Sequence, residues 1–139
     1  AHLAKCVDIA RRSGHKSVSL VTNNAVSGGF LSFGLMADRA YAMKDVSVRV
    51  MDLKAMSRVT KLDYDRLVEL AKASPTFAPG AENYERMGGI ESIWSDVSEN
   101  CLADAFNGIN NARDLRMEKG LVRTGRTEAL KTAEAVLAA

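Results

Sequence analysis

The sequence is poor in the residues that build metal centres and disulfide frameworks. Its 139 residues include only two cysteines, Cys6 and Cys101, and two histidines, His2 and His15. None of the four belongs to a CxxC pair or another metal-ligand spacing, and a secreted disulfide scaffold of this size contains more cysteine. The sequence therefore predicts two reduced, partly buried thiols, no metal site and no tightly bound cofactor.

Long apolar runs and a strong excess of one charge are also lacking. No stretch approaches the roughly 20 uninterrupted apolar residues that cross a bilayer, and nothing at the amino end resembles a secretion signal. The formal net charge of +2 is too small to predict binding to polyanions. We expect a cytoplasmic protein with neither a membrane nor a nucleic acid as partner. Because the chain enters an amphipathic pattern directly at Ala1, we also expect that upstream sequence is missing.

Helix and strand patterns alternate along the chain. Apolar residues at helical spacing predict a first helix that closes at Gly14, where glycine can adopt a left-handed conformation. Alternating and apolar runs predict strands over residues 17–22, 40–43 and 46–51. This interleaving favours an α/β fold, and the chain length favours a single domain over residues 1–139.

Polar residues mark the ends of the later helices. Asp52 is predicted to cap one helix, and Thr60 with Asp63 three positions later resembles a capping pattern for the next. Apolar spacing predicts one long helix over residues 98–120, and Thr127 is predicted to cap the last helix.

The segment from Asn23 to Arg39 carries the most chemical information. A predicted strand ends at two asparagines, and Gly28-Gly29 opens an apolar helix, so the first free amides of that helix lie at the carboxyl end of the strand. Glycine lets a substrate carbonyl approach the main chain, and such amides stabilise an oxygen on which negative charge develops. The competing interpretation is a tight turn with no catalytic role.

The following helix contributes two further expectations. Phe30, Leu31 and Phe33 are predicted to lie in the core. Gly34, in the middle of the helical pattern, predicts close packing against another backbone, because glycine there costs about 1 kcal/mol relative to alanine.

Motifs for side-chain catalysis are lacking. The sequence has no histidine-centred triad, no Gly-x-Ser-x-Gly nucleophile elbow, and no GxGxxG or P-loop motif after a strand. Stabilisation of charge by main-chain groups is therefore the favoured chemistry.

Four segments carry a resemblance to a known family: residues 27–39, 54–60, 83–84 and 87–89. Together with the asparagine-rich turn, they resemble the gamma subunit of biotin-independent malonate decarboxylase, in the carboxyltransferase branch of the crotonase-like superfamily. The likeness runs from about residue 18 to residue 104. It implies an α/β crotonase-like (ClpP/crotonase) fold, here an incomplete domain that lacks its N-terminal strands.

The resemblance implies a function as part of a complex. With a homologous beta subunit, such a chain decarboxylates malonyl on an acyl carrier protein to acetyl, and the carrier's phosphopantetheine-type group bears the thioester. The backbone amides of Gly28 and Gly29 would stabilise the thioester enolate. The other donor of the oxyanion hole would come from upstream sequence or from the partner subunit.

Further residues are assigned expected roles beside this turn. Four are expected to bind the substrate: Asn24, Val26, Ser27 and Met51. Lys54 and Arg58, one helical turn apart, are expected to receive the acidic carrier protein or its phosphate. A structural interpretation stands beside each role: a turn for Asn24, core filling for Met51, and a solvated helix face for the two cations.

Other functions remain open on the same scaffold. One is carboxyl transfer in a biotin-dependent acyl-CoA carboxylase or decarboxylase, and another is a noncatalytic subunit that completes a partner's fold. A hydratase or hydrolase requires acidic side chains over the acyl group, and no acid follows the Gly-Gly turn until Asp38.

Overall fold

Parallel strands form the centre of the molecule. The computed structural model describes residues 2–74, 78–109, 114–125 and 128–138. A three-stranded sheet has the order β1-β3-β5 and consists of β1 (Val18–Val21), β3 (Arg39–Met43) and β5 (Ile93–Trp94). Both pairings are parallel, with Leu20 opposite Tyr41 and Ala42 opposite Ile93. Parallel strands with intervening helices confirm the predicted α/β class.

A second, two-stranded ladder lies beside this sheet. It pairs β2 (Ala25–Val26) with β4 (Val48–Arg49), again in parallel. The predicted strand over residues 46–51 is thus shortened to two residues, and Val48 at its start is fully buried.

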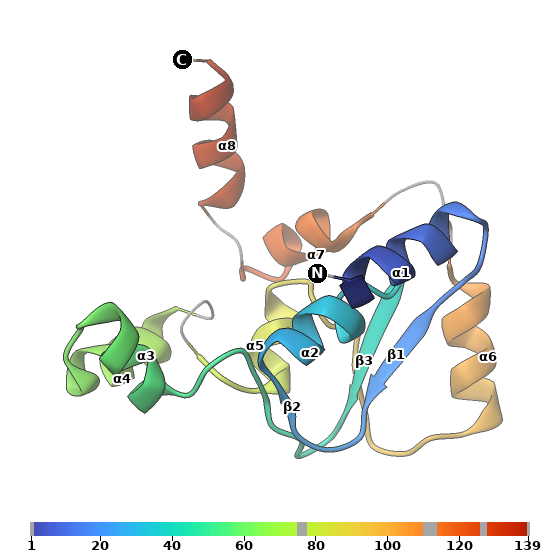
Figure 1. Ribbon diagram of the computed structural model, residues 1–139, viewed down its shortest axis with the longest axis horizontal. Coiled ribbons are helices and arrows are strands. Elements are labelled where there is room, and N and C mark those ends of the chain that lie inside the picture. Colours follow the sequence, from blue (N-terminus) through green and yellow to red (C-terminus); the bar gives the residue numbers. More distant parts are fainter. Residues whose placement is uncertain (1, 75–77, 110–113, 126–127, 139) are drawn as a thin grey trace.

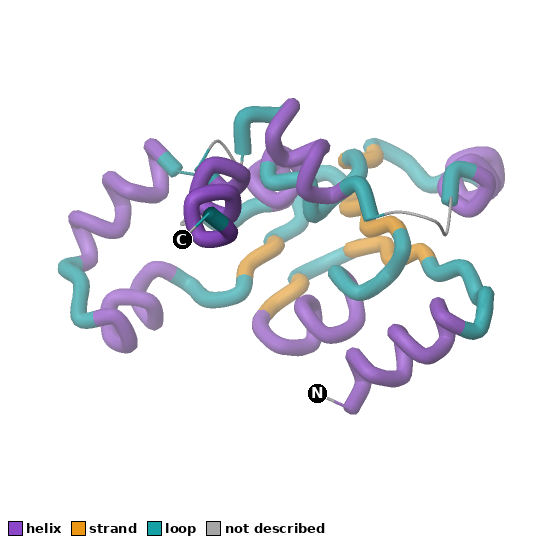
Figure 2. Tube along the Cα trace, turned by 90° about the horizontal axis from the view of Figure 1, so that it is seen from above, coloured by secondary structure: helices purple, strands orange, loops and turns teal. Residues whose placement is uncertain are grey.

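Helices surround the strands and extend away from them. They are α1 (His2–Arg12), α2 (Ser27–Gly29), the π-helical segment η1 (Phe30–Gly34), α3 (Leu53–Thr60), α4 (Tyr64–Ala73), α5 (Ala81–Arg86), α6 (Glu99–Asn107), α7 (Arg116–Val122) and α8 (Ala129–Leu137). In Figures 1 and 2, α3 and α4 form a hairpin that stands apart from the strands, and in Figure 1 α8 also extends away from them. Among the described residues, no helix is long and apolar enough to cross a membrane.

The core joins the helix after β2 to α5. Phe30, Val48, Tyr84 and Ile90 belong to one buried cluster, together with residues of β1 and β3. The rings of Phe30 and Tyr84 meet edge to face, with centroids 5.3 Å apart and planes at 83°. This contact anchors η1 on α5 and adds to the stabilisation that burial of both rings provides.

Two local predictions about helix ends are confirmed. Gly14 has a φ of +85° where α1 closes. Asp52 caps α3, and its carboxylate accepts a hydrogen bond of 2.7 Å from the Ala55 amide. Both signals depend only on neighbours along the chain.

The predicted capping pair after α3 is wrong. Thr60 is the last residue of α3, and its hydroxyl donates to the Met56 carbonyl. Lys61 then adopts a left-handed φ of +62°, which ends the helix. Asp63 itself caps α4, because its carboxylate accepts from the Asp65 and Arg66 amides at 2.9 and 3.2 Å.

The predicted single helix over residues 98–120 is also wrong. The structure has two helices there, α6 and α7. The first ends where the Gly108 carbonyl accepts a hydrogen bond from Arg39, and Ile109 then enters the core. The helical pattern along the chain thus did not locate the break at Gly108. The predicted cap at Thr127 lies outside the described residues.

The burial predictions for the helix after β2 hold for Phe30 alone. Phe30 is 5% exposed, whereas Leu31 and Phe33 are 41% and 59% exposed. A π-helical turn is wider than an α-helical one, so a residue three positions after Phe30 no longer shares its face. A Cβ on Gly34 would lie 2.8 Å from the Phe30 ring, so this glycine makes room for a side chain rather than another backbone.

The prediction for the thiols is correct only in part. Both cysteines are free, but Cys6 on α1 is exposed, while Cys101 on α6 is partly buried. Cys6 lies on a helix with no buried residues, so its side chain faces solvent.

Candidate functional site

The turn between β2 and α2 has an uncommon backbone conformation. Val26 is extended, with φ −131° and ψ 146°, and Ser27 then has a φ of +56°. For a residue with a Cβ this left-handed conformation costs about 1–2 kcal/mol. The Ser27 hydroxyl donates a 3.0 Å hydrogen bond to the Val50 carbonyl, which ties the turn to the segment after β4.

Neither glycine of this turn is required by packing or by backbone conformation. Gly28 and Gly29 both lie outside the left-handed region, and Gly29 has helical angles of −62° and −48°. A Cβ built on either residue would meet no atom within 4 Å. The first N–H groups of a helix have no acceptor within the helix. The two glycines therefore border open space where a ligand oxygen can approach main-chain donors.

Contacts on the inner side hold this turn in place. The Ser32 hydroxyl donates to the Gly28 carbonyl at 2.6 Å, and Phe30 packs edge to face on Tyr84. The Tyr84 phenol oxygen also forms a hydrogen bond with the Val50 backbone. Burial raises the pKa of Tyr84 above its usual value, and this hydrogen bond partly opposes the rise.

Tyr84 is a supporting residue that chemical reasoning from the sequence missed. It lies in one of the segments that carried the family resemblance, but no local pattern indicated that its ring packs on Phe30, the residue after the Gly-Gly turn.

The parallel pairing of β2 and β4 gathers most of the expected substrate residues. Ser27 follows β2 and Met51 lies just after β4, so both are at the carboxyl end of this ladder. Val26 and Met51 are 41% and 36% exposed. Asn24 precedes β2 and lies at the opposite end of the strand. Its backbone N–H donates a 2.8 Å hydrogen bond to the side-chain oxygen of Asn23.

The two cations expected to contact a carrier lie on α3. Lys54 and Arg58 are both exposed and one helical turn apart, on the hairpin that stands away from the strands in Figure 1. Among the described side chains, neither has a carboxylate within 4.0 Å. Both charges are therefore available to a partner.

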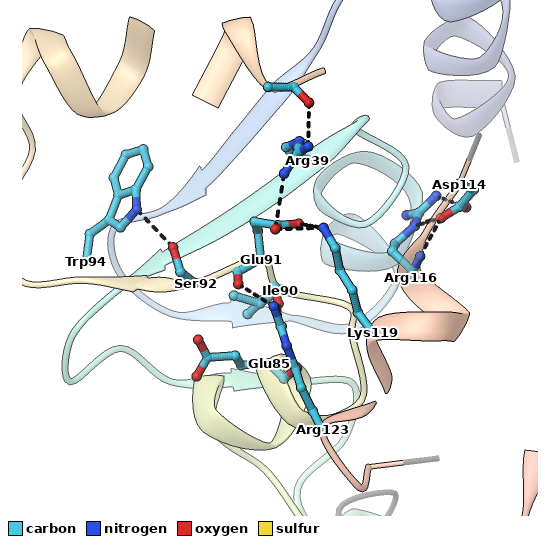
Figure 3. Close-up of polar contacts among 11 residues, drawn as sticks. Arg39, Glu85, Ile90, Glu91, Ser92, Trp94, Asp114, Arg116, Lys119 and Arg123 are labelled. Atoms are coloured by element: carbon cyan, nitrogen blue, oxygen red, sulfur yellow. Dashed lines mark hydrogen bonds and ion pairs between the residues drawn. The ribbon is translucent and has the colours of Figure 1, made fainter. Parts of the chain in front are cut away.

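A group of charged residues fixes α7 on the far side of the core (Figure 3). Glu91 forms ion pairs with Arg39 of β3, at 3.1 Å, and with Lys119 of α7. Arg123 donates to the backbone carbonyls of Glu85 and Ile90 at 2.9 Å and to that of Glu91 at 3.0 Å. These contacts bind α7 to the segment between α5 and β5.

One hollow of the described surface is separate from the Gly-Gly turn. It has a volume of about 1230 Å³ and lies among the end of α4, α5, α7 and the start of α8. Leu35, just after η1, forms part of its wall, but neither glycine of the turn lines it. The described part of the chain also contains no group of three His, Cys, Asp or Glu side chains arranged to hold a metal ion.

Comparison with protein families decides the identity of this scaffold. The sequence profile of the malonate decarboxylase gamma subunit matches residues 1–139. The chain belongs to the malonate decarboxylase gamma-subunit family. This confirms the resemblance carried by the Gly-Gly turn and the later segments.

Relatives of this family member are known in sequence and structure. The malonyl-S-ACP:biotin-protein carboxyltransferase of Malonomonas rubra is 41% identical over 91 residues, which are 63% of this chain and 31% of the relative. A Pseudomonas malonate decarboxylase hetero-tetramer in complex with coenzyme A matches with a TM-score of 0.74 and 26% identity, over 96% of this chain and 57% of that chain.

A second solved structure gives a similar result. The Pseudomonas MdcD-MdcE hetero-dimer matches with a TM-score of 0.69 and 27% identity, over 97% of this chain and 55% of that one. The gamma-subunit chain described here thus spans less than a third of the sequence relative and a little over half of the solved chains.

Proposed function

We propose that this chain acts with a beta subunit to decarboxylate malonyl-S-acyl carrier protein to acetyl-S-acyl carrier protein. Three findings support the proposal: the family of the chain, the malonyl-S-ACP substrate in the name of the Malonomonas relative, and the heteromeric assembly of the Pseudomonas structures. We further propose a crotonase-like fold whose N-terminal strands lie outside this chain.

The reaction requires stabilisation of one oxygen. When the bond between the α-carbon and the carboxylate breaks, CO₂ leaves and the electron pair moves through the α-carbon to the thioester oxygen, forming an enolate. Protonation of the α-carbon then gives the acetyl thioester. No nucleophile takes part, so donors directed at the thioester oxygen lower the barrier.

The observation that carries this proposal is the open backbone at Gly28 and Gly29. Their conformation suits any residue, and no neighbour excludes a Cβ, yet both positions are glycine. Access for a ligand is a physical reason for two side-chain-free residues at the start of a helix. We assign their amides to the thioester enolate.

The surroundings of the turn support a partner that completes the site. The side chains of Leu31 and Phe33 are 41% and 59% exposed on the helical segment that follows the glycines. Large apolar side chains exposed on one short segment form a candidate protein interface. We assign it to the beta subunit, which would also supply the second donor of the oxyanion hole.

The substrate and its carrier are assigned to the remaining residues. Ser27, Val26 and Met51 would contact the acyl group at the carboxyl end of β2 and β4. Asn24 lies at the opposite end of the two-residue strand β2, and we assign it to the far end of the substrate, the malonyl carboxylate. Lys54 and Arg58, exposed on α3, would bind acidic groups of the carrier protein or the phosphate of its phosphopantetheine arm. In this proposal the chain itself holds no tightly bound cofactor.

Substitution of Gly29 tests the assignment of the amides. Gly29→Ala fits the helical backbone and the open space, so it leaves folding intact or stabilises it by up to about 1 kcal/mol. Gly29→Val places branched carbons over the turn. We expect Gly29→Val to lower kcat/KM of the assembled complex by about 10²–10³, the effect of losing one oxyanion donor.

The control is Gly14→Ala, because Gly14 is a glycine far from the turn. This variant tests whether any glycine substitution reduces turnover. A folded, assembled Gly29→Val complex that decarboxylates malonyl-S-acyl carrier protein at the wild-type rate would identify the chain as a noncatalytic scaffold.

Carboxyl transfer to biotin is a second candidate, because the Malonomonas relative is named for that reaction. In that case CO₂ passes to a biotin nitrogen instead of leaving. Avidin distinguishes the two reactions: it leaves decarboxylation by a biotin-independent complex unchanged and abolishes carboxyl transfer.

A further inference from the structure

The helix that bears the Gly-Gly turn is held at its far end by α7. Arg116, the first residue of α7, donates a hydrogen bond from Nη1 to the carbonyl of Leu35. Leu35 is the C-cap of η1, and its own amide donates to the Phe30 carbonyl at 2.9 Å to close the last π-helical turn. One guanidinium therefore contacts the residue that completes the π-helical segment.

The carboxylate of Asp114 fixes the position of this guanidinium. Asp114 accepts hydrogen bonds from Arg116 Nε at 2.9 Å and from Nη2 at 2.6 Å (Figure 3). These bonds lower the pKa of Asp114 despite its partial burial. The planar fork of arginine can satisfy Asp114 and Leu35 at the same time, whereas the single ammonium of lysine cannot reproduce that geometry.

The contact counters the tendency of η1 to rearrange. Carbonyls at a helix end lack partners within the helix, and a cation there also interacts favourably with the helix dipole. A π-helical turn holds one more residue than an α-helical turn. If η1 changed to α-helix, the residues before it would rotate about the helix axis relative to the residues after it, by about the 100° that separates neighbouring residues of an α-helix.

The other end of the helix is fixed at Ser27, which is bonded to Val50. Gly28 and Gly29 lie between this bond and η1. A rearrangement of η1 would reach the two glycines through Phe30, the residue that directly follows them.

We propose that Arg116 is a positioning residue for the amides of Gly28 and Gly29. It maintains the π-helical form of η1 through the Leu35 carbonyl and so sets the direction of these donors. The consequence for turnover rests on the function proposed above, but the conformational effect does not.

A general stabilising role of α7 is the competing explanation, and the chain offers a matched control for it. Arg123 lies on the same helix and also donates to backbone carbonyls, three of them in the segment from Glu85 to Glu91. No described contact of Arg123 reaches η1. Arg116→Gln and Arg123→Gln both weaken the attachment of α7, but only Arg116→Gln releases Leu35.

The conformational test uses the assembled complex in which only this chain is labelled with ¹⁵N-glycine. The chain contains 10 glycines, so each amide resonance can be followed separately. We expect Arg116→Gln to shift the resonances of Gly28, Gly29 and Gly34, and Arg123→Gln to leave those three unchanged. Arg116→Lys should give smaller shifts in the same direction. No shift of the three glycines in Arg116→Gln, or equal shifts in both glutamine variants, would overturn the proposal.

The functional test uses the assembled complex of the same variants. Displaced donors affect the transition state more than substrate binding, so kcat should fall about ten- to hundredfold in Arg116→Gln, with little change in KM. Arg123→Gln should retain the wild-type kcat once assembled. Shifted glycine resonances with an unchanged kcat would show that these amides do not serve the reaction. A fully active Gly29→Val complex would lead to the same conclusion, so both results contradict the proposed function and not the positioning role. Loss of kcat without the shifts would overturn the positioning role alone.

Discussion

Three glycines allow the attachment of α7 to be tested by stability measurements. Gly88, after α5, has a φ of +82°, and a Cβ there would lie 2.1 Å from the Arg116 carbonyl oxygen. Gly125, after α7, has no left-handed φ, but its Cβ would lie 2.2 Å from the Arg86 carbonyl oxygen. Gly14 has a φ of +85° and no atom within 4 Å of a built Cβ.

The three positions separate the cost of the backbone conformation from the cost of the clash. Gly14→Ala changes only the conformational cost and should destabilise the chain by about 1–2 kcal/mol. Gly125→Ala changes only the packing, and overpacking against a backbone that cannot rotate away should cost about 1–3 kcal/mol. Gly88→Ala combines both, and we expect a loss of about 2–5 kcal/mol.

Urea unfolding followed by far-ultraviolet circular dichroism measures all three variants. The expected order of stability is wild type, then Gly14→Ala and Gly125→Ala in either order, then Gly88→Ala. A Gly88→Ala variant no less stable than Gly14→Ala would show that α7 does not lie against the end of α5. The same result would remove the packing that places Arg116 next to η1.

Three further predictions concern single side chains. Asp52→Ala removes the carboxylate that accepts from the Ala55 amide and should lower the free energy of unfolding by about 1 kcal/mol, while Asp52→Asn should lose less; urea denaturation measures both. Burial raises the pKa of Tyr84, so this residue's contribution to stability is complete below about pH 10 and is lost as the pH rises through the folded-state pKa. Raising the pH from about 9 to 11 should therefore lower the free energy of unfolding of Tyr84→Phe less than that of wild type, with each protein compared with its own value at neutral pH. The hydrogen bond from Arg116 lowers the pKa of Asp114, so the stabilisation is present above about pH 4 and is lost as the pH falls through the folded-state pKa. The stability difference between Asp114→Asn and wild type should thus be larger at pH 7 than at about pH 2, and a pH-independent difference would contradict the role of this carboxylate.

The sequence was sufficient where a signal and its effect are close along the chain. The strands β1 and β3, the left-handed Gly14 and the cap at Asp52 all follow from residues within one or two turns of each other. The errors arise where distant segments decide the outcome. The helix after Ser98 ends at Gly108, whose carbonyl accepts from Arg39 of β3, and no periodicity in the later segment records that contact.

The candidate site shows the same division. The Gly-Gly turn was predictable because a polar and glycine-rich segment between a strand and a helix has few structural outcomes. The contact that supports the turn from Arg116 could not be predicted, because Leu35 and Arg116 are 81 residues apart. In the sequence, an arginine two positions after an aspartate also resembles an ordinary surface ion pair. The π-helical form of η1 was equally hidden, since Phe30 and Gly34 carry no sequence signal that distinguishes it from α-helix.

The catalysis by main-chain amides proposed above places a particular demand on the rest of this fold. A backbone N–H has the same chemistry at every residue, so its strength as a donor cannot be adjusted by changing the side chain that bears it. Only its direction and its surroundings can be adjusted, and both depend on how the helix is held. Here the helix is held by Ser27 at one end, by Phe30 on Tyr84 in the middle and by Arg116 at the other end. Variation in rate among such chains should therefore arise at these supports more than at the glycines themselves.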